Sequence, residues 1–347
     1  MPTITSGKVL VSGANGYVAL WVVRSLLEHG YSVRATVRSE SKGTHLRKIF
    51  ASYSEKLELI VVPDITAAGA FDEAVQGVDA IEHTASPFHF KAEDPEEMNR
   101  PAVLGTTRML ESALAHGKAV KRIVVTSSCA SVFNFPVPGK PRTFSEADWN
   151  DQMVEDVKKN GRNAHMYSKY CASKTLAERA AWEFVEKNKG KIGWDLVVLN
   201  PPYVYGPMLQ EVSSPDALNE SMQEWYDAVV KSAHPVKAYV GMASSEWVDV
   251  RDLAEAHTLS LQREAAGGER IIVSGGPWKW QDWVNAARKF GADVPEGDTS
   301  YDAATTVHLT RYDVSKAARI FGIKYHTMDE TTKDIVADLK SRGWIKA

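Results

Sequence analysis

The stretch Ser12-Gly13-Ala14-Asn15-Gly16-Tyr17-Val18-Ala19 decides the fold, because an apolar segment (8–12) meets a segment with helical spacing of apolar residues (17–29) there. At such a junction Gly13 permits a tight turn, Gly16 lets backbone amides approach a pyrophosphate, and Ala19 allows a helix to pack closely on a sheet. The first turn of the helix adds partial positive charge for an anion. No Gly-Lys-Ser/Thr follows, which excludes a Walker loop. The stretch therefore predicts a strand, turn and helix that bind a dinucleotide.

The same alternation of apolar strands and helices continues outward from this stretch. Continuous apolar strands that alternate with helices indicate a parallel sheet covered on both faces. The sequence therefore predicts an α/β doubly wound sheet, the Rossmann fold. Further strands are expected at 32–37, 57–62, 80–83, 122–126 and 195–199, and helices at 44–50, 70–75, 102–116 and 169–187.

The residue composition changes after residue 200, where segments rich in Pro, Tyr and Trp replace the alternating apolar strands and helices. We expect a nucleotide-binding Rossmann domain over 1–200 and mainly a smaller substrate-binding lobe over 201–347, with a return to the main sheet near 245–275. Tryptophans are concentrated in this second part, at Trp225, Trp247, Trp278, Trp280 and Trp283.

Composition narrows the class of protein. The chain has 347 residues, 41 Lys plus Arg against 44 Asp plus Glu, and a net charge of −3, which gives no general attraction to nucleic acid or to an anionic membrane. Two cysteines cannot form a disulfide framework, and no Cys/His cluster has zinc spacing, so no metal site is predicted. The chain begins without a signal-peptide pattern and has no apolar run of membrane-spanning length. We expect a cytoplasmic protein.

The end of the second strand distinguishes the two nicotinamide cofactors. An acidic residue there would accept from the ribose 2′-hydroxyl, whereas arginine pairs with a 2′-phosphate. Here Arg38 ends the strand and Lys42 follows one helical turn later, which favours NADP(H), although Glu40 lies between them. Asp64-Ile65, after the third strand, is placed either to meet the adenine or to cap a helix before 67–70.

A tyrosine and a lysine four residues apart occur twice, at Tyr170–Lys174 and Tyr312–Lys316. Four-residue spacing places both side chains on one helix face, but chance readily produces such pairs. Position distinguishes them, because Tyr170 opens a long predicted helix after a strand that ends at Ser127-Ser128. Ligands bind at this end of the strands in doubly wound sheets. We interpret Tyr312–Lys316, expected in an irregular segment, as structural.

The chemistry of carbonyl reduction explains why Ser128, Tyr170 and Lys174 belong together. Hydride addition creates an alkoxide, which needs a proton and hydrogen-bond donors. Tyr170 would give the proton, a nearby Lys174 ammonium would lower the phenol pKa from its usual value of about 10 and hold the ribose hydroxyls, and Ser128 would bind the substrate oxygen. The rigid segment that begins Asn200-Pro201-Pro202 could offer backbone groups to the nicotinamide carboxamide.

Together these motifs resemble the extended short-chain dehydrogenase/reductases, over nearly the whole chain. The dihydroflavonol-reductase-like branch is the most similar, and within it the NADPH-dependent methylglyoxal and ketone reductases, also called aldehyde or carbonyl reductases. Members of the plant cinnamoyl-CoA-reducing type carry Asn-Trp-Tyr-Cys-Tyr-Gly-Lys near the tyrosine, whereas this chain has Met166-Tyr-Ser-Lys-Tyr-Cys-Ala-Ser-Lys, which argues against that substrate. The matching motifs are Ser-Gly-Ala-Asn-Gly-Tyr (12–17), Val33-Arg-Ala-Thr-Val-Arg, Phe71-Asp-Glu-Ala, His83-Thr-Ala-Ser-Pro, Thr126-Ser-Ser, Tyr170-x-x-x-Lys, Ala177-Glu, Ala180-Ala-Trp and Tyr203-Val-Tyr-Gly-Pro.

The resemblance assigns roles to individual residues. It implies that Ser128, Tyr170 and Lys174 form a catalytic triad. Pocket walls are implied at Phe88, Cys129, Phe133, Tyr203 and the variable segment 208–240, although the aromatic ones could equally be core residues. Cofactor contacts are expected at Gly13, Asn15, Gly16, Tyr17, Val18, Arg38, Lys42, Asp64, Ile65, Thr84, Ala85, Ser86, Pro201 and Val204.

The leading hypothesis is an NADPH-dependent reductase of aldehydes or ketones that acts as a monomer or homodimer. A nucleotide-sugar epimerase or dehydratase of the same fold would recycle a tightly held NAD, and Arg38 argues against it. A non-catalytic NADP(H)-sensing protein would have no need of Ser128, Tyr170 and Lys174 together. The sequence does not identify the physiological carbonyl or the stereochemistry of the alcohol.

The two cysteines directly follow predicted catalytic residues, Cys129 after Ser128 and Cys171 after Tyr170. Small packing residues are one interpretation. A weaker hypothesis places both thiols near the active crevice, so that alkylation would slow turnover and NADPH would protect.

Overall fold

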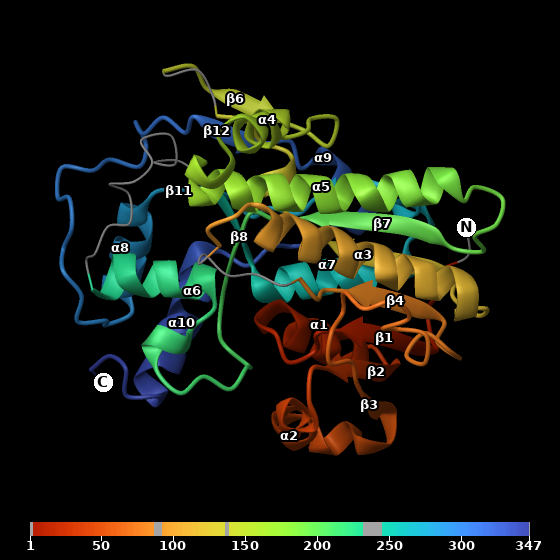
Figure 1. The fold of residues 1–347 in the computed structure, drawn as a ribbon. Helices are drawn as coiled ribbons and strands as arrows, with labels where there is room; N and C mark the ends of the chain where they lie inside the picture. The colour runs from red at the N-terminus through yellow and green to blue at the C-terminus, as the bar shows by residue number, and fades with distance from the viewer. Residues whose placement is uncertain (1–2, 87–91, 136–138, 232–244, 347) are drawn as a thin grey trace.

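The main sheet has seven parallel strands in the order β10-β7-β5-β4-β1-β2-β3 (Figure 1). The structure is a computed structural model that describes residues 3–86, 92–135, 139–231 and 245–346. The chain runs from β1 outward to β3 and then crosses to the other side of β1, so the topology switches between β1 and β4. The strands are β1 (Lys8–Ser12), β2 (Ser32–Val37), β3 (Leu57–Val61), β4 (Ala80–His83), β5 (Arg122–Thr126), β7 (Asp195–Asn200) and β10 (Arg270–Ile272).

Helices cover both faces of this sheet. On one face α1 (Tyr17–Glu28) packs with α7 (Val250–Gln262), and on the other α3 (Glu96–His116) packs with α5 (Met166–Lys187) (Figure 1). Side chains alternate accordingly along β1: Val9 and Val11 join the core beneath α1 and α7, and Leu10 joins the core beneath α3 and α5. The predicted doubly wound parallel sheet is confirmed.

The helix predicted at 70–75 is wrong. The segment forms turns between Gly69 (φ 71°) and Gly77 (φ 68°), and the backbone of Val75 makes a helical bond to Phe71. Glycines in the left-handed region at both ends leave too few residues for a stable helix. Other helices begin earlier than predicted: α2 spans Glu40–Ile49, and α3 continues through Pro101.

The C-terminal part surrounds a smaller three-stranded sheet, β11-β9-β8. Its core is aromatic: the Trp283 ring lies 4.8 Å from Trp247 and 5.0 Å from Tyr205, centroid to centroid. In the described part of the chain, no helix is long and apolar enough to cross a membrane. The remaining elements are β6 (Arg142–Phe144), α4 (Asp151–Asn160), β8 (Tyr203–Tyr205), α6 (Glu220–Trp225), β9 (Ser245–Asp249), β11 (Gly276–Trp278), α8 (Trp280–Lys289), β12 (Thr310–Tyr312), α9 (Ser315–Phe321) and α10 (Met328–Ser341).

Candidate active site

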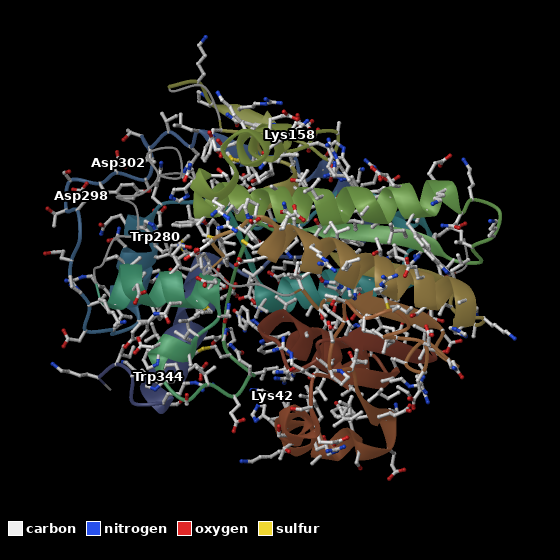
Figure 2. The ribbon with its side chains drawn as sticks, in the orientation of Figure 1. Lys42, Lys158, Trp280, Asp298, Asp302 and Trp344 are labelled. Carbon is white, nitrogen blue, oxygen red and sulfur yellow. The ribbon has the colours of Figure 1, made fainter. Side chains whose placement is uncertain are left out.

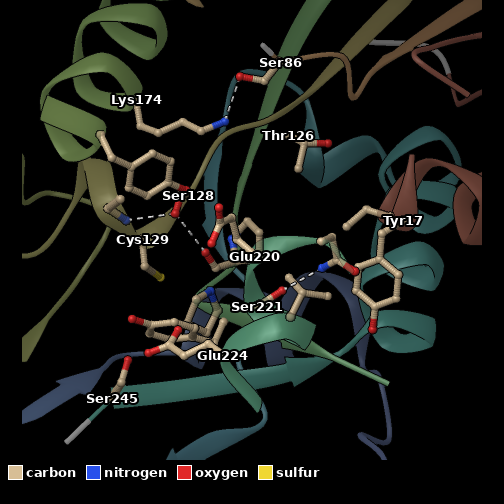
Figure 3. A pocket seen from close by; sticks show the side chains of 18 of the residues that line it. Tyr17, Ser86, Thr126, Ser128, Cys129, Lys174, Glu220, Ser221, Glu224 and Ser245 are labelled. Carbon is tan, nitrogen blue, oxygen red and sulfur yellow. Dashed lines mark hydrogen bonds between the residues drawn. The ribbon is translucent and has the colours of Figure 1, made fainter. Parts of the chain in front are cut away.

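A cavity of about 840 Å³ opens at the carboxyl ends of β1, β4, β5 and β7. This is the topological switch point, where doubly wound sheets bind ligands. Figure 3 shows its side chains, with the hydrogen bond from Lys174 to Ser86 dashed. The predicted site residues that line it are Gly13, Gly16, Tyr17, Val18, Thr84, Ser86, Ser128, Cys129, Phe133, Tyr170, Lys174, Pro201, Tyr203 and Val204.

The glycine loop forms one end of this cavity. Gly13 has φ 63°, and a Cβ there would lie 3.0 Å from the Cβ and 3.1 Å from the Cα of Ala85. The Gly16 amide donates to the Gly13 carbonyl at 2.9 Å, and the buried Tyr17 hydroxyl donates to the Gly206 carbonyl at 3.0 Å. Gly13 and Gly16 therefore present bare backbone to the cavity, which fits the pyrophosphate of a dinucleotide.

Six of the predicted cofactor contacts lie apart from the described cavity walls: Asn15, Arg38, Lys42, Asp64, Ile65 and Ala85. Arg38 and Lys42 are exposed, and Lys42 lies on α2 at the periphery of the molecule (Figure 2). The nearby acid, Glu40, pairs with Arg47 at 3.3 Å. Arg38 at the end of β2 and Lys42 on α2 are thus both exposed, and their contact with a 2′-phosphate stays a prediction.

Asp64 and Ile65 have local partners. The Asp64 carboxylate accepts from the Thr66 amide at 2.8 Å and the Thr66 hydroxyl at 2.7 Å, and these bonds lower the pKa of Asp64. Ile65 packs on α3, where a Cβ on Gly105 would lie 2.8 Å from its Cδ1. Residues 65–70 form turns rather than the helix that Asp64 was expected to cap, and its carboxylate caps the first of these turns. Phe88 lies outside the described residues.

Ser128 and Tyr170 meet at the end of β5. The Ser128 hydroxyl oxygen accepts from the Ala130 amide at 3.0 Å and caps the short helical turn Cys129–Ser131. Burial raises the pKa of Tyr170 to about 12, and a hydrogen bond with Ser128 opposes that rise. The phenol is therefore protonated at neutral pH.

Lys174 lies one helical turn beyond Tyr170 on α5, and its Nζ donates to the Ser86 hydroxyl at 3.1 Å. Burial lowers the pKa of Lys174 to about 8, and the charge of Glu178 opposes the shift. The expected lowering of the Tyr170 pKa by Lys174 is wrong for this structure. Loss of solvation on burial makes the largest contribution to the pKa shift of both groups. The Lys174 ammonium donates to Ser86.

A buried carboxylate that the sequence analysis left without a role connects the elements around the site. Glu178 accepts from Ser127 Oγ (2.6 Å), Ser131 Oγ (2.5 Å), Asn200 Nδ2 (2.8 Å) and Arg270 Nε (2.5 Å). These partners belong to the end of β5, the turn after it, β7 and β10. Glu178 therefore fixes the loop that carries Ser128 relative to the helix that carries Tyr170 and Lys174. The Ala177-Glu178 motif was the only sequence signal.

The wall opposite the sheet comes from the C-terminal part. Glu220 and Glu224 of α6 line the cavity (Figure 3). Trp278 and Trp280 line it as well. Burial raises the pKa of Glu224 to about 7. The segment 208–240 thus contributes side chains from its described portion, and the acidic character of this wall was not anticipated.

Tyr312, interpreted from sequence as structural in an irregular segment, ends strand β12 and lines the cavity. Lys316 does not join it there, because its Nζ donates to Glu269 at 2.7 Å and to the Arg270 carbonyl at 3.1 Å. The strand was missed because it has three residues and pairs with β6, more than 160 positions earlier.

The thiols are both buried. Cys129 lines the cavity and its Sγ donates to the Asn200 carbonyl at 3.2 Å, whereas Cys171 is buried in α5. Burial raises the pKa of both thiols, so neither is a thiolate at neutral pH.

Comparison with known proteins agrees with this architecture. Residues 9–275 match the NAD dependent epimerase/dehydratase family. The chain belongs to that family. Within it, the chain is 35% identical to a putative NADPH-dependent methylglyoxal reductase of Candida albicans, with 96% of this chain and 99% of that protein covered. It is 38% identical to a cinnamoyl-CoA reductase of Arabidopsis thaliana, with 96% and 90% covered.

Among solved structures of the family, yeast methylglyoxal/isovaleraldehyde reductase complexed with NADPH superposes with a TM-score of 0.86 and 32% identity, over 97% of this chain and 99% of that one. The match extends nearly end to end. The predicted membership of the extended short-chain dehydrogenase/reductases is confirmed.

Proposed function

We propose that this protein is an NADPH-dependent carbonyl reductase that converts a small aldehyde or ketone to an alcohol. The observation that supports this proposal most strongly is that Ser128, Tyr170 and Lys174 line the same cavity as the bare backbone of the glycine loop. Relatives of nearly equal length named as NADPH-dependent reductases support the proposal.

In the proposed mechanism, Lys174 and the glycine loop hold the cofactor, and Arg38 and Lys42 receive its 2′-phosphate. A bound nicotinamide supplies a hydride to the carbonyl carbon. Ser128 and Tyr170 donate hydrogen bonds to the carbonyl oxygen, which stabilises the negative charge that develops there. The Tyr170 O–H bond then breaks and its proton forms the alcohol O–H, which leaves a phenolate that takes a proton from solvent before the next turnover.

We further propose that the protein works in the cytoplasm as a monomer or homodimer, without a nucleic-acid or membrane partner. The net charge of −3 supports the absence of a nucleic-acid or anionic-membrane partner.

The test is the loss of reduced-nicotinamide absorbance with a panel of small aldehydes, diketones and aryl ketones, with NADPH and NADH compared. We expect turnover with NADPH and a chemically identified alcohol product. Purified protein that contains bound NAD and acts on a nucleotide sugar would contradict the proposal in favour of an epimerase or dehydratase. Binding of NADPH without turnover of any carbonyl would favour a sensor.

A further inference from the structure

Lys174 also lines a second, much smaller chamber. Its volume is about 20 Å³, and four of its lining residues, Ser86, Thr126, Ser127 and Lys174, also line the large cavity. The chamber therefore adjoins the large cavity, and Lys174 lines both. A volume of this size exceeds the roughly 10–15 Å³ that one water molecule requires.

His83 lines the chamber, and only one of its two ring nitrogens has a hydrogen-bond partner among the described residues. His83 ends β4 and is 2% exposed. Its Nδ1 lies 2.9 Å from Ser12 Oγ, but its Nε2 has no hydrogen-bond partner among the described residues. Buried polar atoms in folded proteins nearly always have a partner, either protein or ordered water.

The surroundings of Ser12 settle which ring nitrogen carries the proton. Ser12 Oγ accepts from the amide of Thr84 at 3.1 Å and from the amide of Ala85 at 3.0 Å, which uses both lone pairs. Its own hydrogen is then free only for His83 Nδ1, so Nδ1 accepts. The neutral ring therefore carries its proton on Nε2, as a donor without an acceptor.

The ring is neutral at physiological pH. Burial, and secondly the charge of Lys174, lower the pKa of His83 to about 4. Acceptors for a water are also present: the Thr106 hydroxyl gives its hydrogen to the Ala102 carbonyl at 3.0 Å, which leaves its lone pairs available in the chamber.

We propose that this chamber is a binding site for one water molecule, which accepts hydrogen bonds from His83 Nε2 and the Lys174 ammonium, so that His83 is a positioning residue for Lys174. The role for Lys174 rests on the proposed reductase function. The water site itself does not.

Two measurements on the unmodified protein test the site without any assay of activity. Imidazole ¹⁵N NMR should show His83 protonated at Nε2 and unprotonated at Nδ1 at pH 7. A crystal structure at high resolution should show an ordered water within hydrogen-bond reach of both His83 Nε2 and Lys174 Nζ. The opposite tautomer would overturn the proposal. So would an empty chamber with Nε2 turned toward the Phe71 ring, whose centroid lies 6.0 Å from that of His83.

Kinetics test the positioning role. The water stabilises the charged form of Lys174, so His83→Leu should move the alkaline limb of kcat/KM for NADPH about one pH unit lower, a tenfold change in the ionisation constant. His83→Gln, which keeps a donor, should restore the limb. Glu178 is the other charged group that acts on Lys174 and is unchanged in both variants.

Thr106→Val removes an acceptor from the far side of the chamber and should shift the limb in the same direction, which keeps the test open if His83→Leu fails to fold. An unchanged limb in folded His83→Leu and Thr106→Val would overturn the positioning role. Absence of reductase activity in the wild type would instead overturn the proposed function and leave the NMR and crystallographic tests intact.

Discussion

At the scale of single residues, the sequence predicted three residues that line one cavity, but not their ionisation. Ser128, Tyr170 and Lys174 were identified because a serine ends an apolar strand and a tyrosine and lysine share a helix face. Their pKa values depend on burial by segments distant in sequence, such as Pro201 and Tyr203, which line the same cavity. This is why Tyr170 is shifted upward rather than downward.

Lys174 gives the free enzyme a predicted pH dependence. Its folded pKa is about 8, so the ammonium is present below that pH and is lost as pH rises through it. We expect kcat/KM for NADPH, which reports the free enzyme, to fall above about pH 8. Lys174→Arg should keep its charge and lose this limb, at a reduced overall rate. A profile that stays flat to pH 10 in the wild type would contradict the assignment.

Arg38 is predicted to select the phosphorylated cofactor. A hydrogen bond to a charged group contributes about 1.5–3 kcal/mol, so Arg38→Ala should weaken NADPH binding by about 10- to 100-fold and leave NADH binding nearly unchanged. Titration of cofactor fluorescence measures both. The matched control is Arg47→Ala, because Arg47 is a similarly exposed arginine that pairs with Glu40. Equal losses for both cofactors would show that Arg38 does not read the 2′-phosphate.

At the scale of elements, the parallel strands of the main sheet were predictable because short runs rich in apolar residues alternate with helical segments. The strands 8–12, 32–37, 80–83 and 122–126 have the predicted bounds. The helix at 70–75 failed because local spacing does not reveal glycine backbone conformation. The short strand β12 depends on pairing with β6, a partner that no local pattern identifies.

The interaction that joins these elements at the site predicts a large loss of stability. Removing one partner of a buried, hydrogen-bonded ion pair typically costs about 3–5 kcal/mol. Glu178→Leu removes the carboxylate to which Arg270 Nε and Asn200 Nδ2 donate, so chemical denaturation should show a loss of that size. Glu183→Gln, on the exposed face of the same helix, should change the free energy of unfolding by less than about 0.5 kcal/mol. Equal stabilities would refute the structural role of Glu178.

At the scale of the whole molecule, the cavity lies between the carboxyl edge of the main sheet and a wall from the C-terminal part. The first side follows from the sequence, since strand ends and the glycine loop are local features. The second side does not, because Glu220, Trp278 and Tyr312 reach the cavity through three separate segments. Trp225 of α6 and Trp278 of β11 both pack against Trp283, whereas Tyr312 packs against Phe144.

NADPH should stabilise the folded molecule as a whole, because only the folded cavity binds it. At 100 times Kd the gain is about 2.7 kcal/mol, which should raise Tm by several degrees in a thermal melt. Gly13→Ala should abolish this shift, because its Cβ would lie 3.0 Å from that of Ala85. Gly190→Ala, also at positive φ but in open space, should keep the shift. Equal shifts in both variants would count against the loop as the cofactor cradle.

The most direct test of the central claim compares two tyrosines of the same cavity. Single-turnover oxidation of bound NADPH by an accepted carbonyl substrate is measured in Tyr170→Phe and in Tyr312→Phe. If Tyr170 gives the proton, Tyr170→Phe lowers the single-turnover rate constant by a factor on the order of 10²–10⁴. Tyr312 has no lysine partner at the cavity, since Lys316 pairs with Glu269, so Tyr312→Phe keeps a rate constant within a few-fold of wild type. Turnover in Tyr170→Phe equal to wild type, or a larger loss in Tyr312→Phe, would contradict the account.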